Sequence, residues 1–409
     1  MGHLLNEKLL LNEQHGFVPF NSCTTNLLET LDFLTSALNK KESVDMLLLD
    51  LKNAFEKVEH EKLITKLEAY GIGGDPLAWI KDFLQGRSQK VVLGNSESDW
   101  ENVMSGVPQG SVLGPMFFII FINDLPSNLK YSLTKMFADD CKLIARVLGM
   151  RDGVCLQNDL DILVRWTHEW NMTLNCFKCK VMHFGKNNPK TDYFLTDKNG
   201  NRVKLEVSEC ERDLGVFVSN DLKWDKHVNT VVNRASFILG RFRRTFVSRD
   251  ETLWKKNYLT YVRPHLEFAV QAWNPYLKKD VNLLEKVQRR ASKIPSTLRN
   301  LEYKIRLRKW GLTTLEKRRK RGDCILMYKI LKKKEALKFT KELVWSEPRF
   351  GLPKLRPELV KNCGPRYNFF ANRVANTWNC LPSTVVEALS VNSFKEKYDN
   401  FDLNLFFIF

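Results

Sequence analysis

The sequence predicts an α+β fold in which helices pack on one side of a sheet. Two observations support this prediction. Short apolar runs end in acids at Asp50 and at the adjacent pair Asp139 and Asp140, as expected for a buried strand and a hairpin. Leucines at helical spacing fill the segments around these runs, and a glycine-rich loop lies between them.

The first part of the chain predicts a helix, a strand and a helix in that order. Residues 22–38 carry leucines at helical spacing and predict a helix with one buried face. Residues 44–50 are mostly apolar and predict a buried strand with Asp50 near its exit. Residues 53–70 have apolar positions on one helical face, and Gly71 is positioned to end that helix.

A further helix and a strand are predicted next. Asp75 and Pro76 suit the cap and first turn of a helix that Gly86 closes. Residues 89–93 predict a strand that ends in a turn at residues 94–96.

The stretch KMFADDCKLI at residues 135–144 leaves two interpretations open. Adjacent acids between short apolar runs are found in ordinary exposed turns, and also in hairpins that hold a metal ion. These ten residues do not decide between them.

The composition indicates a globular protein with an anionic partner. A chain of 409 residues, 44% of them hydrophobic, can bury a large core and suggests two or three domains. Its 64 Lys and Arg against 47 Asp and Glu give a pI near 9.4, which favours a polyanion as the partner. The alternative is a basic surface that serves only solubility.

The positive charge is concentrated near the C-terminus. Residues 277–340 contain 21 Lys and Arg against 6 Asp and Glu, and so carry +15 of the chain's +17. Apolar residues interrupt this segment at near-helical spacing, which predicts helices with one packed face and one face offered to phosphates. A solvated charged face is the alternative interpretation.

Targeting and cysteine patterns point to a reduced intracellular compartment and to no membrane partner. The longest apolar runs are far shorter than the roughly 20 residues of a membrane helix. Asn6 stands where a myristoylation motif has Ser or Thr, and no secretory segment follows. Nine cysteines are scattered along the chain, which suits a reduced compartment better than a disulfide framework. Cys176 and Cys179 have the spacing of two zinc ligands, but no second Cys pair follows, so ordinary core thiols are favoured over structural zinc.

The three acids suggest phosphoryl transfer. Asp50 lies 89 positions before Asp139, yet a sheet can bring the two strand ends together. Three clustered carboxylates repel one another, so we expect them to bind Mg²⁺, which prefers oxygen ligands. Two such ions about 3.5–4 Å apart can activate an attacking hydroxyl and neutralise a departing pyrophosphate.

A loop between the acids suits close approach to a ligand. The segment SGVPQGSVLGP at residues 105–115 contains three glycines and two prolines in eleven residues. Such a bare backbone can approach a template strand or a nucleotide, and Gln109 offers both a donor and an acceptor there. In isolation the loop is better interpreted as a turn before the apolar helix that starts at Met116, and its place between two strand-borne acids favours the ligand-binding interpretation.

Several segments, in this order, resemble the reverse transcriptase of a non-LTR, jockey-like (LINE-type) retrotransposon. They are LLLDLKNAFEKV, SGVPQGSVLGP, INDLP, FADD and NCFKCKVMHFG, followed by DLGVFVSNDLKWDKHV, YVRPHLEFAVQAWNP, LLEKVQRRASK, YKIRLRKWGL and VANTWNCLP. The resemblance covers nearly the whole chain. It implies a right-hand polymerase with fingers and an antiparallel palm sheet in residues 1–200, a connection and thumb in 201–275, and a basic, mostly helical region in 276–409.

The resemblance also implies roles for individual residues. Asp50, Asp139 and Asp140 match the metal-binding acids of the palm, which hold two Mg²⁺ ions, with Mn²⁺ as an alternative. Phe55 matches the aromatic residue that screens the incoming sugar and excludes a ribose 2′-hydroxyl. Lys178 matches a lysine that protonates pyrophosphate or holds it in place.

The remaining expected contacts are to nucleotide and nucleic acid. Gly106, Gln109 and Gly110 match positions that touch the nucleotide and the template. The basic C-terminal region implies contacts to nucleic acid, for which we select four arginines: Arg289, Arg290, Arg318 and Arg319. The expected partners are an RNA template, a DNA primer and dNTPs, and no protein partner is indicated.

The chain departs from the family pattern at several places. Phe20 and Asn21 stand where the family usually has Gly-Arg, and Glu56 stands where it usually has Asp. The sequence begins where the family's fingers are already under way, without the upstream Arg-Pro-Ile block, and with no endonuclease domain before it. We therefore expect an N-terminally truncated enzyme that does not cut target sites.

Three hypotheses follow. The first is an RNA-directed DNA polymerase that extends a primer 3′-hydroxyl by two-metal catalysis. The second is a truncated, catalytically silent copy that still binds nucleic acid through residues 277–340. The third is a structural scaffold for protein partners, which salt dependence separates from the other two. A basic run at residues 317–321 is either a nuclear import signal or part of the phosphate-facing surface. We expect a nuclear rather than cytoplasmic location.

Overall fold

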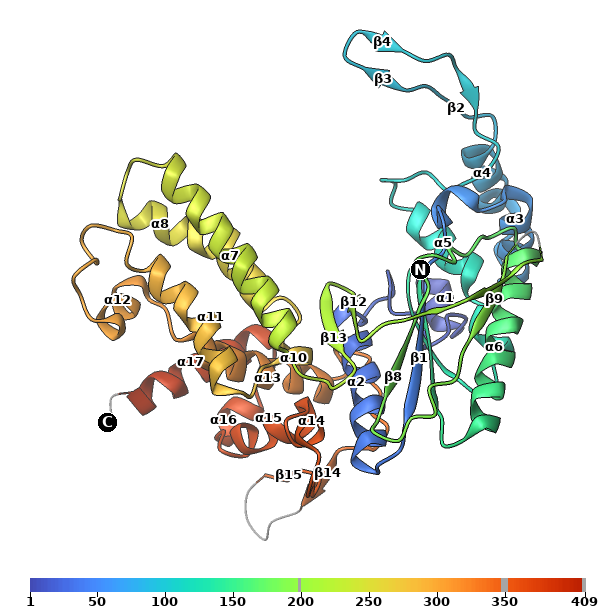
Figure 1. The fold of residues 1–409 in the computed structure, drawn as a ribbon. Coiled ribbons are helices and arrows are strands. Elements are labelled where there is room, and N and C mark those ends of the chain that lie inside the picture. Colours follow the sequence, from blue (N-terminus) through green and yellow to red (C-terminus); the bar gives the residue numbers. More distant parts are fainter. Residues whose placement is uncertain (198–199, 347–351, 407–409) are drawn as a thin grey trace. The chain divides into compact units, whose positions relative to one another are not determined.

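The computed structural model describes residues 1–197, 200–346 and 352–406, and Figure 1 follows the chain through them. The chain forms two compact units. The first contains Met1–Asn26 and Lys41–Glu209, and the second contains Leu27–Lys40 and Cys210–Phe409. The boundaries between the units therefore fall inside helix α2 (Cys23–Asn39), after Lys40 and after Glu209. The finer three-part division expected from the sequence stays a prediction.

A five-stranded sheet forms the centre of the first unit, in the order β11-β8-β1-β7-β6. Its strands are β1 (Val44–Leu49), β6 (Leu133–Phe137), β7 (Asp140–Arg146), β8 (Lys180–Phe184) and β11 (Glu206–Val207). Strand β1 is central and runs antiparallel to both β7 and β8. Its side chains are almost all buried, which explains its nearly continuous apolar sequence.

The helices of the first unit pack around an extensive apolar core that includes residues of the sheet. They are α1 (Gly2–Asn6), η1 (Ala54–Lys57), α3 (His60–Ala69), α4 (Gly74–Leu84), α5 (Gly114–Ile122), η2 (Leu125–Asn128) and α6 (Met150–Glu169). Helix α5 is apolar on every side because it is buried on almost every side. The α+β fold class expected from the sequence is confirmed.

Two helix predictions differ from the structure. The segment predicted as one helix over residues 53–70 is divided into η1 and α3, because Val58 adopts an extended conformation and its carbonyl accepts a hydrogen bond from Gly106 N at 2.8 Å. Helix α4 begins at Gly74, with Gly73 at its N-cap, so Asp75 is not the cap.

Short strands complete the first unit. A long hairpin extends away from the rest of this unit and contains β2 (Ser88–Gln89), β3 (Val92–Leu93), β4 (Ser96–Glu97) and β5 (Glu101–Asn102). The strand predicted over residues 89–93 is thus interrupted at residues 90 and 91. A separate pair is formed by β9 (Phe194–Thr196) and β10 (Arg202–Lys204).

The second unit is mostly helical. It opens with the hairpin of β12 (Cys210–Asp213) and β13 (Val216–Ser219). Its main helices are α7 (Asp225–Thr245), α8 (Glu251–Asn257), η3 (Tyr258–Val262), α9 (Arg263–Glu267), α10 (Val270–Trp273), α11 (Lys278–Ala291), α12 (Tyr303–Trp310) and α13 (Leu315–Leu331). Helices α11 and α13 confirm the prediction, made from the spacing of apolar residues, that the basic segment is helical.

The C-terminal segments of the second unit are fixed by charged contacts. They comprise β14 (Val344–Ser346), β15 (Lys354–Arg356), α14 (Gly364–Tyr367), α15 (Phe370–Asn379), α16 (Ser383–Val386) and α17 (Val391–Phe406). Arg366 is buried and pairs with Asp32 of α2 at 2.6 Å and with Glu358 at 2.7 Å. Since breaking a buried pair leaves an uncompensated charge, these contacts anchor the C-terminal segments to α2.

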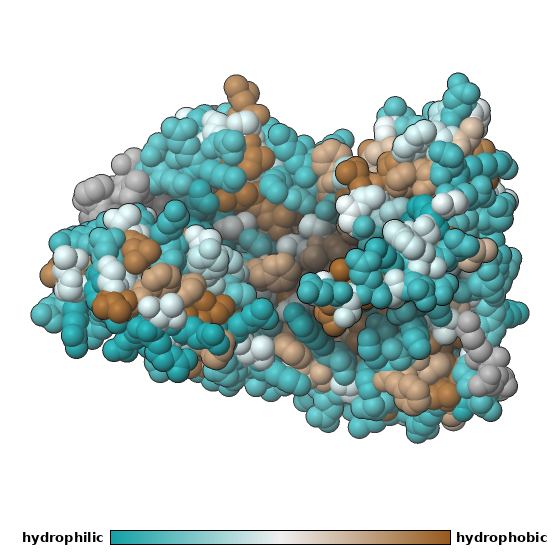
Figure 2. All heavy atoms as spheres, turned by 90° about the horizontal axis from the view of Figure 1, so that it is seen from above, coloured by the Kyte–Doolittle hydropathy of each residue, from teal (hydrophilic) through white to brown (hydrophobic). Residues whose placement is uncertain are grey.

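One face of the molecule is largely polar (Figure 2). Hydrophilic residues cover most of the face shown in Figure 2, and apolar residues are scattered among them. Over the described ranges of the chain, no helix is both long enough and apolar enough to span a bilayer.

Candidate active site

Strand β1 delivers Asp50 to one edge of the central sheet. Asp50 follows the last residue of β1, and both its backbone carbonyl and its backbone N–H form hydrogen bonds. Its carbonyl accepts a hydrogen bond from Asn175 N at 2.8 Å, and its N–H donates to Cys179 Sγ at 3.4 Å. The side chain is 36% exposed and therefore reaches solvent from a fixed backbone.

The β6–β7 hairpin delivers the other two acids to the same edge. Leu49 pairs with Cys141, so the next step of the register sets Asp50 opposite Asp140. Ala138 and Asp139 form the two-residue connection, and Ala138 adopts a left-handed conformation with φ of 53°. Asp139 is half-buried and Asp140 is exposed. The structure therefore brings together the three acids, here termed the acidic corner (Asp50, Asp139 and Asp140).

The acidic corner carries negative charge that is only partly compensated. Burial raises the pKa of Asp139, and the charge of Asp50 raises it further, which means that the two carboxylates interact. The Lys178 ammonium lies 3.8 Å from Asp50 Oδ2, at the edge of ion-pair distance, and its side chain is 68% exposed. Lys178 is thus close to the acids and free to move toward a ligand.

The donor chemistry of the acidic corner fits a divalent cation, although the acids are not gathered into a closed cage. Over the described residues, no three His, Cys, Asp or Glu side chains are close enough together to hold a metal ion by themselves. Carboxylates that repel one another spread apart without a cation, and Mg²⁺ sites commonly take only one or two carboxylates plus substrate phosphates.

An N-terminal segment that sequence reasoning missed holds the turn of the acidic corner. Gln14 Oε1 accepts a hydrogen bond from Ala138 N at 2.9 Å, and Gln14 Nε2 donates to Ala138 O at 3.3 Å. His15 N also donates to Met136 O at 2.9 Å. A Cβ on Gly16 would lie 2.3 Å from Ala138 N, so only glycine permits this approach.

Phe55 occupies η1, immediately after the strand that carries Asp50. Its ring stacks on Phe118 of α5, with centroids 4.2 Å apart and planes inclined by 17°. Phe118 is fully buried, so it forms a fixed support for the partly buried Phe55. Sequence reasoning identified Phe55 but not Phe118, because nothing local in the sequence relates the two rings.

The start of the glycine-rich loop is bonded to η1. Val107 N donates to Phe55 O at 2.9 Å, and Ser105 Oγ donates to Glu56 O at 2.8 Å. Gly106 has φ of 91°, and a Cβ there would lie 2.9 Å from the Glu56 backbone. Gly106 is therefore required for the close approach of the loop to η1, and its expected contact with the nucleotide stays a prediction.

The tip of the loop is open. Gln109 and Gly110 are exposed, and a Cβ at Gly110 would meet no atom within 4 Å. Toward its end the loop turns tightly into α5, since a Cβ at Gly114 would lie 2.5 Å from Pro108 O. The Gln109 amide is therefore presented on a well-anchored loop.

The four arginines expected to contact nucleic acid differ in their exposure and in their contacts. Arg289 and Arg290 are exposed on α11. Arg319 is only 3% exposed, and Arg318 binds Glu267 through two nitrogens. Contrary to the sequence-based expectation, Arg318 and Arg319 do not form a surface for phosphates, because one is buried and the other is already paired.

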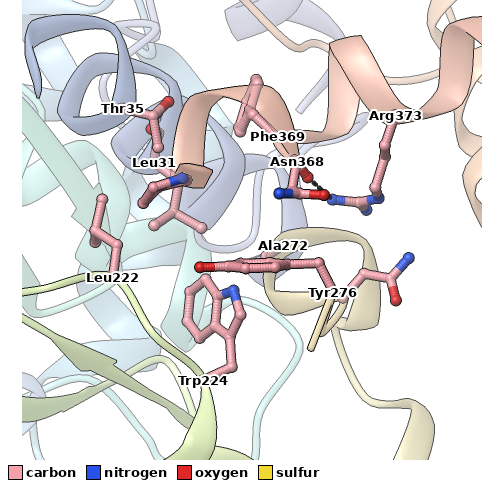
Figure 3. Close-up of a pocket in the computed structure, with 11 residues that line it drawn as sticks. Leu31, Thr35, Leu222, Trp224, Ala272, Tyr276, Asn368, Phe369 and Arg373 are labelled. Carbon is pink, nitrogen blue, oxygen red and sulfur yellow. Dashed lines mark hydrogen bonds between the residues drawn. The ribbon is translucent and has the colours of Figure 1, made fainter. Parts of the chain in front are cut away.

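The pocket in Figure 3 is not a nucleotide site. It lies in the second unit, and its lining includes Leu31, Trp224 and Tyr276. Arg373 Nη1 there donates to Asn368 O at 3.2 Å. The cavity volume of about 20 Å³ is sufficient for a water molecule and not for a nucleotide.

Comparisons with known proteins agree with this geometry. The family model described as reverse transcriptase (RNA-dependent DNA polymerase) matches residues 3–227. The chain is 27% identical over 290 residues to the RNA-directed DNA polymerase from mobile element jockey of Drosophila funebris, covering 67% of this chain and 31% of that protein. It is 25% identical over 292 residues to the probable RNA-directed DNA polymerase from transposon X-element of Drosophila melanogaster, covering 69% and 31%.

Among solved structures, the chain is weakly similar to telomerase from Candida tropicalis in complex with a TWJ fragment of telomeric RNA. The TM-score is 0.42 at 12% identity, covering 70% of this chain and 43% of that one. The chain spans about a third of the length of the two curated relatives. Since the family model covers more than half of the chain and includes the acidic corner, Phe55, Gln109 and Lys178, this chain belongs to the reverse transcriptase (RNA-dependent DNA polymerase) family.

Proposed function

We propose that this chain is an RNA-directed DNA polymerase that adds dNTPs to the 3′-hydroxyl of a primer. The observation that carries the proposal is the acidic corner, where residues from β1 and from the β6–β7 hairpin meet at one edge of the sheet. The interaction between the Asp50 and Asp139 carboxylates supports it, because neighbouring carboxylates at an exposed edge suit cation-assisted phosphoryl transfer.

The acids would hold the divalent metal ions that this family generally uses. Asp50 and Asp139 are the first ligands we assign, with Asp140 beside them, and Mg²⁺ is the proposed ion, with Mn²⁺ able to replace it. When bound, such ions supply Lewis-acid stabilisation of charge on the transferred phosphoryl group. Lys178, with its exposed ammonium near Asp50, is proposed to stabilise or protonate the departing pyrophosphate.

The loop and η1 would select and position the nucleotide. Phe55, supported by Phe118, is proposed to contact the sugar and to exclude a ribose 2′-hydroxyl. Gln109 and Gly110 are exposed at the loop tip and are proposed to contact the nucleotide and the template. Gly106 allows the loop to approach η1 and is proposed to lie beside the nucleotide.

The proposed partners are an RNA template, a DNA primer and dNTPs. Family membership supports binding of a nucleic-acid template, and the high positive charge of the chain is consistent with it. A nuclear location stays a prediction.

Primer extension tests the proposed function. Wild type should incorporate dTMP on poly(rA)/oligo(dT) in the presence of Mg²⁺. Asp139→Asn should reduce the rate by at least about 100-fold, because a catalytic metal is worth several kcal/mol of transition-state stabilisation. Equal incorporation by both proteins would contradict the assignment. No incorporation by either, with salt-sensitive RNA binding retained, would favour the catalytically silent nucleic-acid-binding protein.

Discrimination against ribonucleotides tests the role of Phe55 and its support. Phe55→Val should lower the ratio of kcat/KM for dTTP over UTP by about 10-fold or more, since it opens space for the 2′-hydroxyl. Phe118→Leu should lower the same ratio by about 2- to 10-fold, because an aromatic pair contributes about 0.5–1.5 kcal/mol.

Phe117→Leu is the matched control for these variants. Phe117 is equally buried in α5, but its ring contacts Phe83 rather than Phe55. The ratio of kcat/KM for dTTP over UTP should therefore stay unchanged in Phe117→Leu. If ribonucleotide use does not rise in Phe55→Val, the sugar-screening role is wrong. If Phe117→Leu and Phe118→Leu act alike, the effect belongs to the core and not to the stacked pair.

Turnover should depend on Gln14 although it is distant in sequence from the acids. Gln14→Leu leaves the Ala138 N–H without its acceptor, at a cost of about 1–3 kcal/mol, and loosens the turn that carries Asp139. We expect kcat in primer extension to fall by about 10-fold or more while KM for dTTP changes little. Asn12→Ala, exposed in the same segment, should have no effect. A lowered melting temperature with unchanged kcat would show that Gln14 is only structural.

A further inference from the structure

A large open hollow lies on the second unit between α7, α11 and the start of α12. Two adjoining cavities of about 740 and 1120 Å³ share Arg290, Lys293 and Arg299 in their walls. The first extends along α7 toward Arg243, and the second extends along α11 toward Lys304 of α12. We call this continuous surface the basic groove.

The basic groove is lined by exposed cations without acidic partners. Seven of its lining residues are exposed and basic: Arg243, Lys286, Arg289, Arg290, Lys293, Arg299 and Lys304. Glu302 is the one acid among the residues that line the two cavities. Within the described part of the chain, none of the seven cations forms an ion pair with a carboxylate. Such a concentration of like charge repels itself unless an anion is bound.

The basic run on α13 is different, although it dominates the sequence pattern. Arg318 binds Glu267, Lys320 pairs with Glu316 at 3.0 Å, and Arg321 binds Asp399 at 2.5 and 2.7 Å. The charges of this run are therefore largely neutralised within the protein. The basic groove differs from this run, because seven exposed cations meet there and no ion pair is found for them over the described residues.

The walls of the groove are held in place by polar contacts. Arg290 Nη2 donates to Ser236 Oγ at 2.7 Å and so joins α11 to α7. Arg306 is buried and donates to Ser292 Oγ at 3.1 Å and to Leu301 O at 2.7 Å, which fixes the segment between α11 and α12. A site built in this way loses little entropy when a ligand binds.

The lining offers charge but no exposed ring for stacking on bases. Tyr303 is its aromatic residue, and that ring is covered by the guanidinium groups of Arg289 at 4.5 Å and Arg306 at 5.4 Å. The Tyr303 hydroxyl is also bound to Glu285 and Gln288. Base-stacking sites for single strands need free aromatic faces, so the groove suits contacts to the backbone only.

We propose that the basic groove binds the sugar–phosphate backbone of a nucleic acid without reading its bases. The proposal rests on the proposed function, since it takes nucleic acid as the ligand of the chain. It assigns the contact to Lys286, Lys293 and Arg299 with their neighbours, and not to the α13 run. The binding requires no divalent cation, because its electrostatic partner is the cationic groove itself.

Two triple variants of the full chain test this proposal, each removing three charges. The groove variant is Lys286→Gln, Lys293→Gln and Arg299→Gln. The control variant is Lys320→Gln, Lys333→Gln and Lys334→Gln, which changes exposed lysines on α13 and just after it. Binding of fluorescent oligo(U) and oligo(A) is followed by anisotropy in EDTA over a range of salt concentrations.

The groove variant should weaken binding and reduce the slope of log K against log salt by about 2, at about 0.7 per lost phosphate contact on a single strand. The control should retain the wild-type slope, and both oligonucleotides should bind the wild type equally well. Equal slopes for the two variants would overturn the proposal, since binding would then follow net charge alone. A strong preference for one base would overturn backbone-only binding.

The outcomes separate this proposal from the proposed function. If the groove variant alone loses affinity while wild type fails in primer extension, the groove stands and the polymerase assignment falls. If wild type extends primers and the groove variant binds like wild type, the groove proposal falls alone.

Discussion

The repulsion between the Asp50 and Asp139 carboxylates is the interaction on which the account of this protein depends. Two acids 89 residues apart come close because β1 pairs with β7 on one side and β8 on the other. Hydrogen bonds from Asn175 N and to Cys179 Sγ hold the backbone of Asp50, so only the side chains of the acids can turn away from one another there. The sheet therefore maintains negative charge at its edge, and a cation is the ordinary way to compensate it.

The first unit fixes its catalytic candidates through backbone contacts rather than through side-chain pairs. Gln14 binds the turn at Ala138, and the loop at Gly106 binds η1 beside Phe55. Both contacts require a glycine where two backbones meet, at Gly16 and Gly106. This arrangement restricts where the functional side chains can go. The second unit shows the opposite charge pattern, with unpaired cations in a groove whose walls are fixed by Arg290 and Arg306.

Local patterns in the sequence predicted the strand that ends at Asp50, the hairpin of Asp139 and Asp140, and helices α2, α11 and α13. Periodicity and turn residues are sufficient for such elements. The sequence could not reveal Gln14 or Phe118, because each acts across a long separation and no periodic signal links it to its partner. The sequence pattern was a poor guide to Arg318 and Arg319. A run of basic residues does not show that Arg319 is buried, or that Arg318 pairs with Glu267, which lies 51 residues away.

If Asp50 and the 139–140 turn form one cation site, the free protein should bind a divalent cation there. Binding of Mn²⁺ to the full chain, followed by electron paramagnetic resonance without nucleotide or nucleic acid, should be observed for wild type. It should be weakened at least about tenfold by Asp50→Asn. Asp99→Asn, which removes an exposed acid of the β2–β5 hairpin, should bind like wild type. Undiminished Mn²⁺ binding by Asp50→Asn would contradict the claim that Asp50 and the 139–140 turn form one cation site.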